Sequence, residues 1–295
     1  MTAQIISGRD IASEIKEELT QEIAALKAKH NLVPGLATVL VGENPASQIY
    51  VGQKEKTSQA LGIYSERHDL PADTNEAELL ALVDKLNKDP KIHGILVQLP
   101  LPEHINSTKV LYLIDPGKDV DAFHPVNVGK LMIGEPDFLP CTPHGIYQLL
   151  IRSGVNIKGA EVVVVGASNI VGRPVAALLS LEKEGFGGTV TLCHILTKDI
   201  SVHTKRADIL IVAVGKPKLV TADMVKNGVV VIDVGTNRIG KTAEGKDILV
   251  GDVDFEAVKE KAKAITPVPG GVGPMTIAML MMNTVKAAKL AAGLA

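Results

Sequence analysis

Five polar residues in the first half of the chain have types and spacing that could act on one ligand. Ser47, Tyr50 and Lys54 are separated by three and then four residues within 45–61, a segment we expect to be helical, so they should share one helix face. Gln98 ends an apolar strand, and Asp121 stands in a later loop. An amine beside an amide and a carboxylate can transfer protons and bind a polar ligand.

Each of these residues also has an ordinary explanation. An isolated helical lysine is most often a solvated surface charge, and an isolated tyrosine often packs. Asp119 and Asp121 could simply form turns. Position favours the functional alternative, because ligands of open parallel sheets bind at the carboxyl ends of strands. Gln98 lies at such an end, and the helix with Lys54 begins just after another.

The first 115 residues alternate helical and strand patterns, which predicts an open, mainly parallel sheet. Residues 115–143 are rich in Pro and Gly, and we expect a long ordered loop between domains there, then a helix at 143–153. The elements expected before that loop are helices at 9–29, 45–61, 75–87 and 107–114 and strands at 36–41, 63–70 and 92–99.

A second alternating region begins with the apolar, β-branched run 161–165, which is typical of a strand buried on both faces. Gly166, Ser168 and Gly172 follow directly, and then a helical segment. Strand, glycine turn and helix point backbone N–H groups at a phosphate. The alternative is an ordinary glycine-rich turn, because GASNIVG is not the full G-x-G-x-x-G fingerprint.

We therefore expect an α/β protein of two parallel-sheet domains, the second Rossmann-like, with a cleft between them. The first domain should comprise 1–120 and 275–295, and the second 121–274. The final helix, 274–291, should pack back over the first domain. The other elements expected in the second region are strands at 189–193, 208–214 and 229–234, helices near 171–183, 199–206, 221–227 and 252–261, and a surface hairpin or loop over the charged segment after 236.

Composition excludes several classes of function. Of 295 residues, 46% are apolar, which is enough for sizeable cores. A net charge of −2, without a basic block, and only 3% aromatic residues argue against a nucleic-acid partner. We expect no signal peptide, no membrane span and no metal site. Cys141 and Cys193 are expected to be free thiols in a reducing cytoplasm.

Six segments, taken together and in order, resemble the methylenetetrahydrofolate dehydrogenase/cyclohydrolase family, also called the FolD family. The resemblance runs from about residue 8 to about residue 290. The segments are YVGQKEKTSQALGI (50–63), GILVQLPLP (94–102), KDVDAF (118–123), PCTP (140–143), VVGASNIVGRP (164–174) and PVPGGVGPMT (267–276).

The resemblance implies two reactions in one cleft. A nicotinamide cofactor takes hydride from 5,10-methylenetetrahydrofolate, and water then opens the resulting 5,10-methenyl ring to give 10-formyltetrahydrofolate. This places the protein in one-carbon metabolism and purine biosynthesis, as a cytoplasmic homodimer. Two alternatives stay open: an enzyme with only one of the activities, and a catalytically silent folate- or nucleotide-binding protein.

By matching motif, Lys54 would be the catalytic lysine, Gln98 would hydrogen-bond and tune it, and Tyr50 would stack on or orient the folate. Asp121 would hold the pterin ring, whose amino-pyrimidinone edge is rich in donors. Lys54 should act in its neutral form, because the methenyl intermediate is cationic and would repel an ammonium. The remaining folate-binding candidates are Ser47, Pro269, Gly270 and Gly273, although PVPGGVGP is also a sound helix N-terminal turn.

The choice of cofactor depends on the end of the second strand in the second domain. NAD-binding domains place an acidic residue there, whereas TVTLC ends at Cys193-His194, so NADP is expected, with NAD as the alternative. Many family members have Gly-Arg-Ser in the glycine turn and His-Ser-Arg-Thr after the second strand. This chain has Ala167 and Ile195-Leu196 there, leaving Arg173 and Lys198 as substitutes. The cofactor-binding candidates are Gly166, Ala167, Ser168, Arg173 and Thr236.

Overall fold

A computed structural model describes residues 2–242 and 245–294 of the chain. It divides into two compact units, each built on a parallel sheet. The six-stranded unit comprises Met1–Ser13 and Thr142–Thr276, and the three-stranded unit comprises Glu14–Cys141 and Ile277–Ala295. The α/β class and the parallel sheets expected from the sequence are confirmed.

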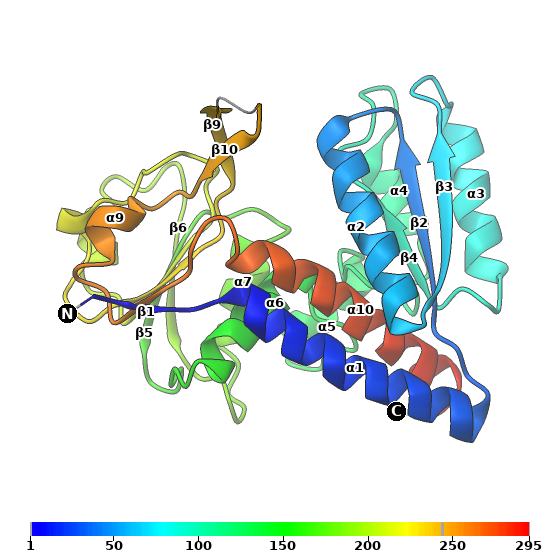
Figure 1. Ribbon diagram of the computed structural model, residues 1–295, viewed down its shortest axis with the longest axis horizontal. Coiled ribbons are helices and arrows are strands. Elements are labelled where there is room, and N and C mark those ends of the chain that lie inside the picture. Colours follow the sequence, from blue (N-terminus) through cyan, green and yellow to red (C-terminus); the bar gives the residue numbers. More distant parts are fainter. Residues whose placement is uncertain (1, 243–244, 295) are drawn as a thin grey trace. The chain divides into compact units, whose positions relative to one another are not determined.

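The three-stranded unit has the sheet order β3-β2-β4 with every pairing parallel. Helices α3 and α4 cover one face, where Ala37 and Val39 of β2 pack against Leu79 and Val83 of α3. Helix α2 packs on β2 and β3 (Figure 1). The elements are α1 (Gly8–His30), which begins in the other unit, β2 (Gly35–Val41), α2 (Pro45–Leu61), β3 (Tyr64–Leu70), α3 (Glu76–Lys88), β4 (Gly94–Val97), α4 (Ser107–Leu113) and α5 (Pro125–Met132).

The last helix, α10 (Val272–Ala291), completes the three-stranded unit from Ile277 onward. Ser58 of α2 donates a hydrogen bond to the Met281 sulfur at 3.2 Å, and both residues are fully buried. The Asn283 amide donates to the Val120 carbonyl at 2.7 Å. Helix α10 therefore packs against α2 and the Val120 segment within this unit.

The six-stranded unit has the strand order β1-β11-β8-β7-β5-β6. Read from the β6 edge, the order is β6-β5-β7-β8-β11. The chain therefore moves from β5 outward to β6 and then back past β5 to β7, which is a doubly wound arrangement whose switch point lies between β5 and β7. The elements are β1 (Gln4–Ile5), α6 (Cys141–Arg152), β5 (Glu161–Val165), α7 (Gly172–Leu179), β6 (Thr189–Cys193), α8 (Ser201–Thr204), β7 (Ile209–Val212), the 3₁₀ turn η1 (Ala222–Met224), β8 (Val230–Asp233), the antiparallel hairpin β9 (Asn237–Lys241) and β10 (Asp247–Val250), α9 (Phe255–Val258) and β11 (Ala264–Ile265).

Some predicted elements were wrong. The expected loop 115–143 contains α5, which His124 caps by accepting the Val126 N–H, with Pro125 at the first helical position. Buried Leu131 anchors this helix. The helix predicted at 221–227 is only the 3₁₀ turn η1. The short strands β1 and β11 were not predicted, because two residues carry no periodicity.

The bounds of the two units differ from the predicted domain boundaries at three places, one of which is a shift of the last boundary from residue 275 to Ile277. Residues up to Ser13 join the six-stranded unit because β1 pairs with β11. Residues 121–141 join the three-stranded unit, where Cys141 and Asn283 both contact the Val120 carbonyl. Long-range pairing of this kind leaves no local signal in the sequence.

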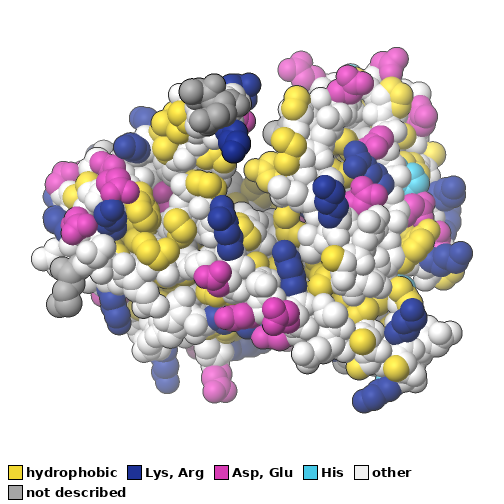
Figure 2. Space-filling view, in the orientation of Figure 1, with side chains coloured by type: hydrophobic (Ala, Val, Ile, Leu, Met, Phe, Trp, Pro, Cys, Tyr) yellow, Lys and Arg dark blue, Asp and Glu magenta, His cyan; other side chains and the backbone are white. Residues whose placement is uncertain are grey.

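Charged side chains of both signs are mixed over the face drawn in Figure 2. Within residues 2–242 and 245–294, no helix is long and apolar enough to cross a membrane. Over the same ranges, no cluster of three or more His, Cys, Asp or Glu side chains could hold a metal ion.

Candidate functional site

The predicted lysine–glutamine pair forms within the three-stranded unit. Lys54 lies on α2, and its Nζ donates a hydrogen bond to Gln98 Oε1 at 2.9 Å. Gln98 directly follows β4; its backbone N–H donates to the Val39 carbonyl at 2.9 Å and its own amide nitrogen donates to the Leu99 carbonyl at 2.7 Å. Lys54 is only 8% exposed, so its amine is held in place rather than solvated. The surface-charge explanation for this lysine is therefore wrong.

Asp121 is the acidic member of this group. Burial raises the pKa of its carboxyl group, and the nearby positive charge of Lys54 and a hydrogen bond with Cys141 act in the opposite direction. Burial and the charge of Asp121 in turn raise the pKa of the Cys141 thiol well above its usual value. Lys54, Gln98 and Asp121, predicted separately from three segments, therefore gather in one unit.

Asp119 is a turn-forming residue, which is the ordinary role that the sequence allowed for both aspartates. Its buried carboxylate accepts the backbone N–H groups of Phe123 at 3.2 Å and His124 at 2.8 Å and the amide of Asn127 at 2.8 Å. Burial raises the pKa of Asp119 despite these donors. The turn that presents Asp121 is thus fixed by the aspartate two residues before it.

The other two residues of the predicted helix face differ in exposure. Ser47 is buried, and its backbone N–H donates to Asn44 Oδ1 at 3.1 Å, as expected for an asparagine that caps α2. Tyr50 is 47% exposed, so its ring is not a core residue. An exposed tyrosine one turn from a buried lysine is suited to contact a planar ligand.

Sequence reasoning missed two residues that shape this group. Asn283 donates to the carbonyls of Val120 at 2.7 Å and Leu139 at 2.9 Å, and Cys141 Sγ donates to the Val120 carbonyl at 3.3 Å. Both residues are buried. An asparagine within the apolar run MLMMNTV was the available signal, because a buried amide needs partners.

The glycine turn lies in the six-stranded unit, between β5 and α7. Gly166 has a φ of +116°, and a Cβ there would lie 2.1 Å from the Ala213 carbonyl oxygen. A Cβ on Gly172 would lie 1.7 Å from the Gly166 oxygen. Ser168 Oγ accepts the Val171 N–H at 3.1 Å and closes the turn. The turn therefore brings backbone against backbone at the start of α7. The first N–H groups of α7 are bonded within the turn, since Gly172 donates to Ser168 Oγ at 3.4 Å and Arg173 donates to the Ser168 carbonyl at 3.0 Å.

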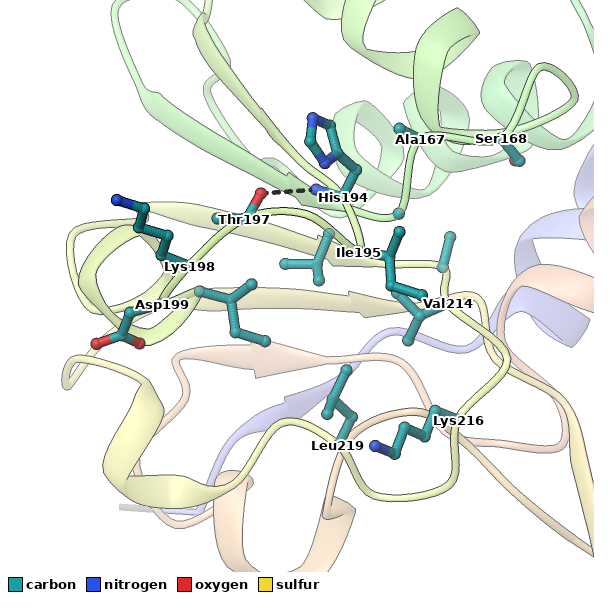
Figure 3. Close-up of a pocket in the computed structure, with 14 residues that line it drawn as sticks. Ala167, Ser168, His194, Ile195, Thr197, Lys198, Asp199, Val214, Lys216 and Leu219 are labelled. Carbon is teal, nitrogen blue, oxygen red and sulfur yellow. Dashed lines mark hydrogen bonds between the residues drawn. The ribbon is translucent and has the colours of Figure 1, made fainter.

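A pocket of 710 Å³ opens at this turn, at the carboxyl ends of β5, β6 and β7. The turn after β5 contributes Gly166, Ala167 and Ser168, and the loop after β7 contributes Ala213, Val214 and Lys216 (Figure 3). The loop after β6 contributes His194, Ile195 and residues 197–200. This edge is the switch point of the sheet, where nucleotides bind in doubly wound folds. Its shape and its glycine turn fit a dinucleotide.

The charged groups of the pocket come mainly from the loop after β6. Asp199 lines the pocket, but its carboxylate accepts the backbone N–H of Ser201 at 2.8 Å and the Ser201 hydroxyl at 2.7 Å, which lowers its pKa. Lys198 lies beside it, and in Figure 3 both side chains extend away from Ala167. Arg173 and Thr236 do not line this pocket, and Arg173 donates to Asn169 Oδ1 at 3.1 Å.

The remaining predicted residues lie in the six-stranded unit, at the turn before α10 and in its first turn. Gly270 has a φ of +109°, and its carbonyl accepts the Arg9 N–H at 3.2 Å. Pro269 and Gly273 are exposed. The folate-binding role of these three residues and the cleft between domains stay predictions.

A doubly wound parallel sheet with a pocket at its switch point defines a nucleotide-binding α/β protein. Comparison with known families is more specific. Residues 140–292 match the family model for the tetrahydrofolate dehydrogenase/cyclohydrolase NAD(P)-binding domain, and residues 6–121 match that for the catalytic domain. The chain belongs to the tetrahydrofolate dehydrogenase/cyclohydrolase family, as the sequence motifs predicted.

Individual relatives are similar over the whole chain. The bifunctional protein FolD of Syntrophus aciditrophicus (strain SB) is 65% identical over 294 residues, covering 100% of both chains. The crystal structure of the bifunctional enzyme FolD from Campylobacter jejuni has a TM-score of 0.92 at 50% identity and covers 98% of this chain and 99% of that one. The Trypanosoma brucei FolD structure, described as complexed with NADP cofactor and inhibitor, has a TM-score of 0.93 at 41% identity, with 99% of each chain covered.

Proposed function

We propose that this protein oxidises 5,10-methylenetetrahydrofolate to 5,10-methenyltetrahydrofolate with NADP⁺ and then hydrolyses the product to 10-formyltetrahydrofolate. The observation that carries the proposal is the hydrogen bond from buried Lys54 to Gln98, beside Asp121, in a chain of this family. The relatives named above are bifunctional proteins of the same length, and one of their structures is described as an NADP complex. We assign the folate chemistry to the three-stranded unit and cofactor binding to the six-stranded unit.

Lys54 is the proton-transfer group of the hydrolysis. Water attacks the cationic methenyl carbon and must lose a proton as the new C–O bond forms. A neutral amine at Lys54 can donate one N–H to Gln98 Oε1 and still use its lone pair to accept that proton. The side-chain amide of Gln98 is held by its bond to the Leu99 carbonyl, and the backbone of Gln98 by its bond to the Val39 carbonyl, so Gln98 fixes the direction of the lysine nitrogen.

Asp121 and Tyr50 orient the folate. A carboxylate accepts hydrogen bonds from the N–H groups of an amino-pyrimidinone edge, and Asp121 offers one next to the proton-transfer lysine. The exposed ring of Tyr50 lies one helical turn before Lys54 and offers a flat surface to the pterin. Ser47, Pro269, Gly270 and Gly273 are the further contacts that we propose for the folate.

The protein's part in hydride transfer is orientation. When bound, NADP⁺ supplies the hydride acceptor, and the transfer itself needs no protein acid or base. The turn formed by Gly166, Ala167 and Ser168, which lines the pocket just before α7, would hold the pyrophosphate. Arg173 and Thr236 stay proposed cofactor residues that lie outside the pocket lining.

The alternatives from the sequence are less well supported. A silent binding protein would not need a buried lysine bonded to an amide beside a carboxylate. An enzyme with a single activity is disfavoured because both halves of the chain match their family models and the relatives are named bifunctional.

A direct assay tests the proposal. Purified protein is given 5,10-methylenetetrahydrofolate with NADP⁺ or NAD⁺, and loss of 5,10-methenyltetrahydrofolate is followed in a separate cuvette without cofactor. We expect turnover in both assays and a preference for NADP⁺. No turnover of either folate would reject the proposal, and turnover in one assay alone would favour the single-activity alternative.

Lys198 is our candidate for the cation that recognises the 2′-phosphate of NADP⁺. It lines the pocket, whereas Arg173 does not. Replacing Lys198 by Ala should weaken NADP⁺ binding about tenfold, the loss of roughly 1.4 kcal/mol of a charge-assisted contact, and leave NAD⁺ binding within about twofold. Isothermal titration calorimetry with both cofactors measures this discrimination.

Lys216 provides the matched control, because it lines the same pocket from the loop after β7. Lys216→Ala should change the affinities for NADP⁺ and NAD⁺ by the same factor. Equal losses for the two cofactors in Lys198→Ala would show that another group reads the 2′-phosphate.

We further propose that the protein works as a cytoplasmic homodimer whose product supplies purine biosynthesis. Strand β6 lies at an edge of the six-stranded sheet, and an open edge can pair with a second copy. The free, buried thiols of Cys141 and Cys193 suit a reducing compartment.

A further inference from the structure

Asp252 is a fully buried carboxylate just after β10 whose two oxygens accept hydrogen bonds from separate segments. Its Oδ2 accepts the backbone N–H groups of Val214 at 2.7 Å and Gly215 at 2.9 Å. Its Oδ1 accepts the side-chain amide of Asn237 at 2.8 Å. One buried side chain therefore accepts three hydrogen bonds from two separate segments.

The segments joined by Asp252 follow neighbouring strands at the pocket edge of the sheet. Val214 comes two residues after β7 and lines the 710 Å³ pocket, as does Lys216 (Figure 3). Asn237 begins β9 and directly follows Thr236, one of the proposed cofactor residues. Asp252 thus reaches both loops from behind the pocket, without lining the pocket itself.

A second buried carboxylate fixes the backbone of Asp252. Oδ1 of Asp233, the last residue of β8, accepts the N–H groups of Gly235 at 3.0 Å and Asp252 at 2.9 Å. Its Oδ2 accepts the Val253 N–H at 2.9 Å. Asp233, at the end of β8, therefore holds the backbone of Asp252 in place, and the side chain of Asp252 in turn holds the two loops.

Two glycines make room for this pair of carboxylates. A Cβ on Gly235 would lie 2.3 Å from Asp252 Oδ1, and a Cβ on Gly251 would lie 1.8 Å from Asp233 Oδ2. Both distances are far below van der Waals contact, so each carboxylate packs directly against glycine backbone. The arrangement has no tolerance for a displaced carboxylate at either position.

We propose that Asp252 is a positioning residue for cofactor binding: it holds the loops after β7 and β8 in the conformation that shapes the NADP pocket. This inference rests on the proposed function. Without the carboxylate, the N–H groups of Val214 and Gly215 lose their shared acceptor, and the loop after β7 loses the contact that ties it to Asp252. Val214 and Lys216 then leave their places in the pocket wall.

Calorimetric titration of NADP⁺ into wild type and three variants tests the inference. Asp252→Ala should weaken binding at least about tenfold, which corresponds to about 1.4 kcal/mol. Asp252→Asn keeps one acceptor oxygen for the backbone but turns its amide toward the Asn237 amide, so an intermediate loss is expected. Asp254→Ala, two residues away in an ion pair with Lys218, is the matched control and should bind as wild type does.

A compensating change separates positioning from general damage. In the double variant Asp252→Asn with Asn237→Asp, donor and acceptor exchange places, and NADP⁺ affinity should return to within about threefold of wild type. Hydrolysis of 5,10-methenyltetrahydrofolate, measured without cofactor, should stay near the wild-type rate in every variant. Lys54 and Gln98 lie in the other unit, which is why this readout should not move.

Unchanged NADP⁺ affinity in a folded Asp252→Ala variant would overturn the inference, and if that variant does not fold, unchanged affinity in the isosteric Asp252→Asn would do so. Hydrolysis that falls in parallel with NADP⁺ affinity would also overturn it, because the effect would then be a general loss of structure. Wild-type protein that binds no NADP⁺ would reject the proposed function itself, before any variant is compared.

Discussion

Replacing Lys54 by Met should abolish hydrolysis of 5,10-methenyltetrahydrofolate while leaving folate binding measurable. Methionine keeps the length of the buried side chain but cannot accept a proton, and it leaves Gln98 Oε1 without its 2.9 Å donor. A positioned proton-transfer group contributes roughly 10² to 10⁴ in rate, so a loss of at least about 100-fold is expected. Absorbance decay of the methenyl compound gives the rate, and calorimetry gives the affinity for folate.

Lys56 supplies the control on the same helix, because it is exposed two residues further along α2. Lys56→Met removes the same charge and adds the same thioether, and it should hydrolyse as fast as wild type. Full hydrolysis by Lys54→Met would show that another group takes the proton. An equal loss in both variants would point to net charge rather than to the position of the amine.

The elements with strong local patterns could be predicted from the sequence. Helix α2 begins at Pro45 after Asn44 and ends at Leu61, as its cap, proline and glycine signals indicate. Strand β5 occupies the same residues as the apolar run 161–165, because a strand buried on both faces needs no alternation. Short elements were missed where pairing partners, rather than propensity, decide the conformation, as in β1 and β11.

The candidate site divides in the same way. Lys54 and Gln98 could be located from helix phase and strand end, which are local properties, and the hydrogen bond that the family resemblance implies between them is present. The turn-forming role of Asp119 could not be predicted, because the sequence shows two similar aspartates. Asp119 is identified as the turn former only by its burial and by the three donors that its carboxylate accepts. Asp252 escaped notice because its donors come from segments 15 to 38 residues away.

The cofactor half departs from the family pattern at Ala167 and at Ile195-Leu196. Ile195 is 98% exposed and Leu196 is 82% exposed, so neither side chain is needed for the core. The turn is held instead by its own backbone and by Thr197, whose hydroxyl accepts the His194 N–H at 3.0 Å (Figure 3). Residues of such a loop can be replaced without loss of the fold. Lys198, in the same loop, can therefore take the role of binding the phosphate.

Replacing Gly172 by Ala should remove NADP⁺ binding and dehydrogenase activity together. The new Cβ would lie 1.7 Å from the Gly166 oxygen and 3.1 Å from the Ala167 Cα, so the glycine turn and the start of α7 must separate. Overpacking of backbone against backbone costs roughly 1–3 kcal/mol of stability and moves the glycine turn that we propose holds the pyrophosphate. We expect NADP⁺ affinity to fall at least about 100-fold, which is about 2.7 kcal/mol.

The hydrolysis rate distinguishes this local effect from unfolding. Lys54, Gln98 and Asp121 belong to the three-stranded unit, so Gly172→Ala should still hydrolyse 5,10-methenyltetrahydrofolate at a rate close to wild type. Gly240→Ala, on the exposed hairpin of the same unit, places its Cβ 4.0 Å from the nearest atom and should bind NADP⁺ normally. Tight NADP⁺ binding by Gly172→Ala would mean that the cofactor does not depend on the turn after β5, and the phosphate site would have to be sought elsewhere along the carboxyl edge of the sheet.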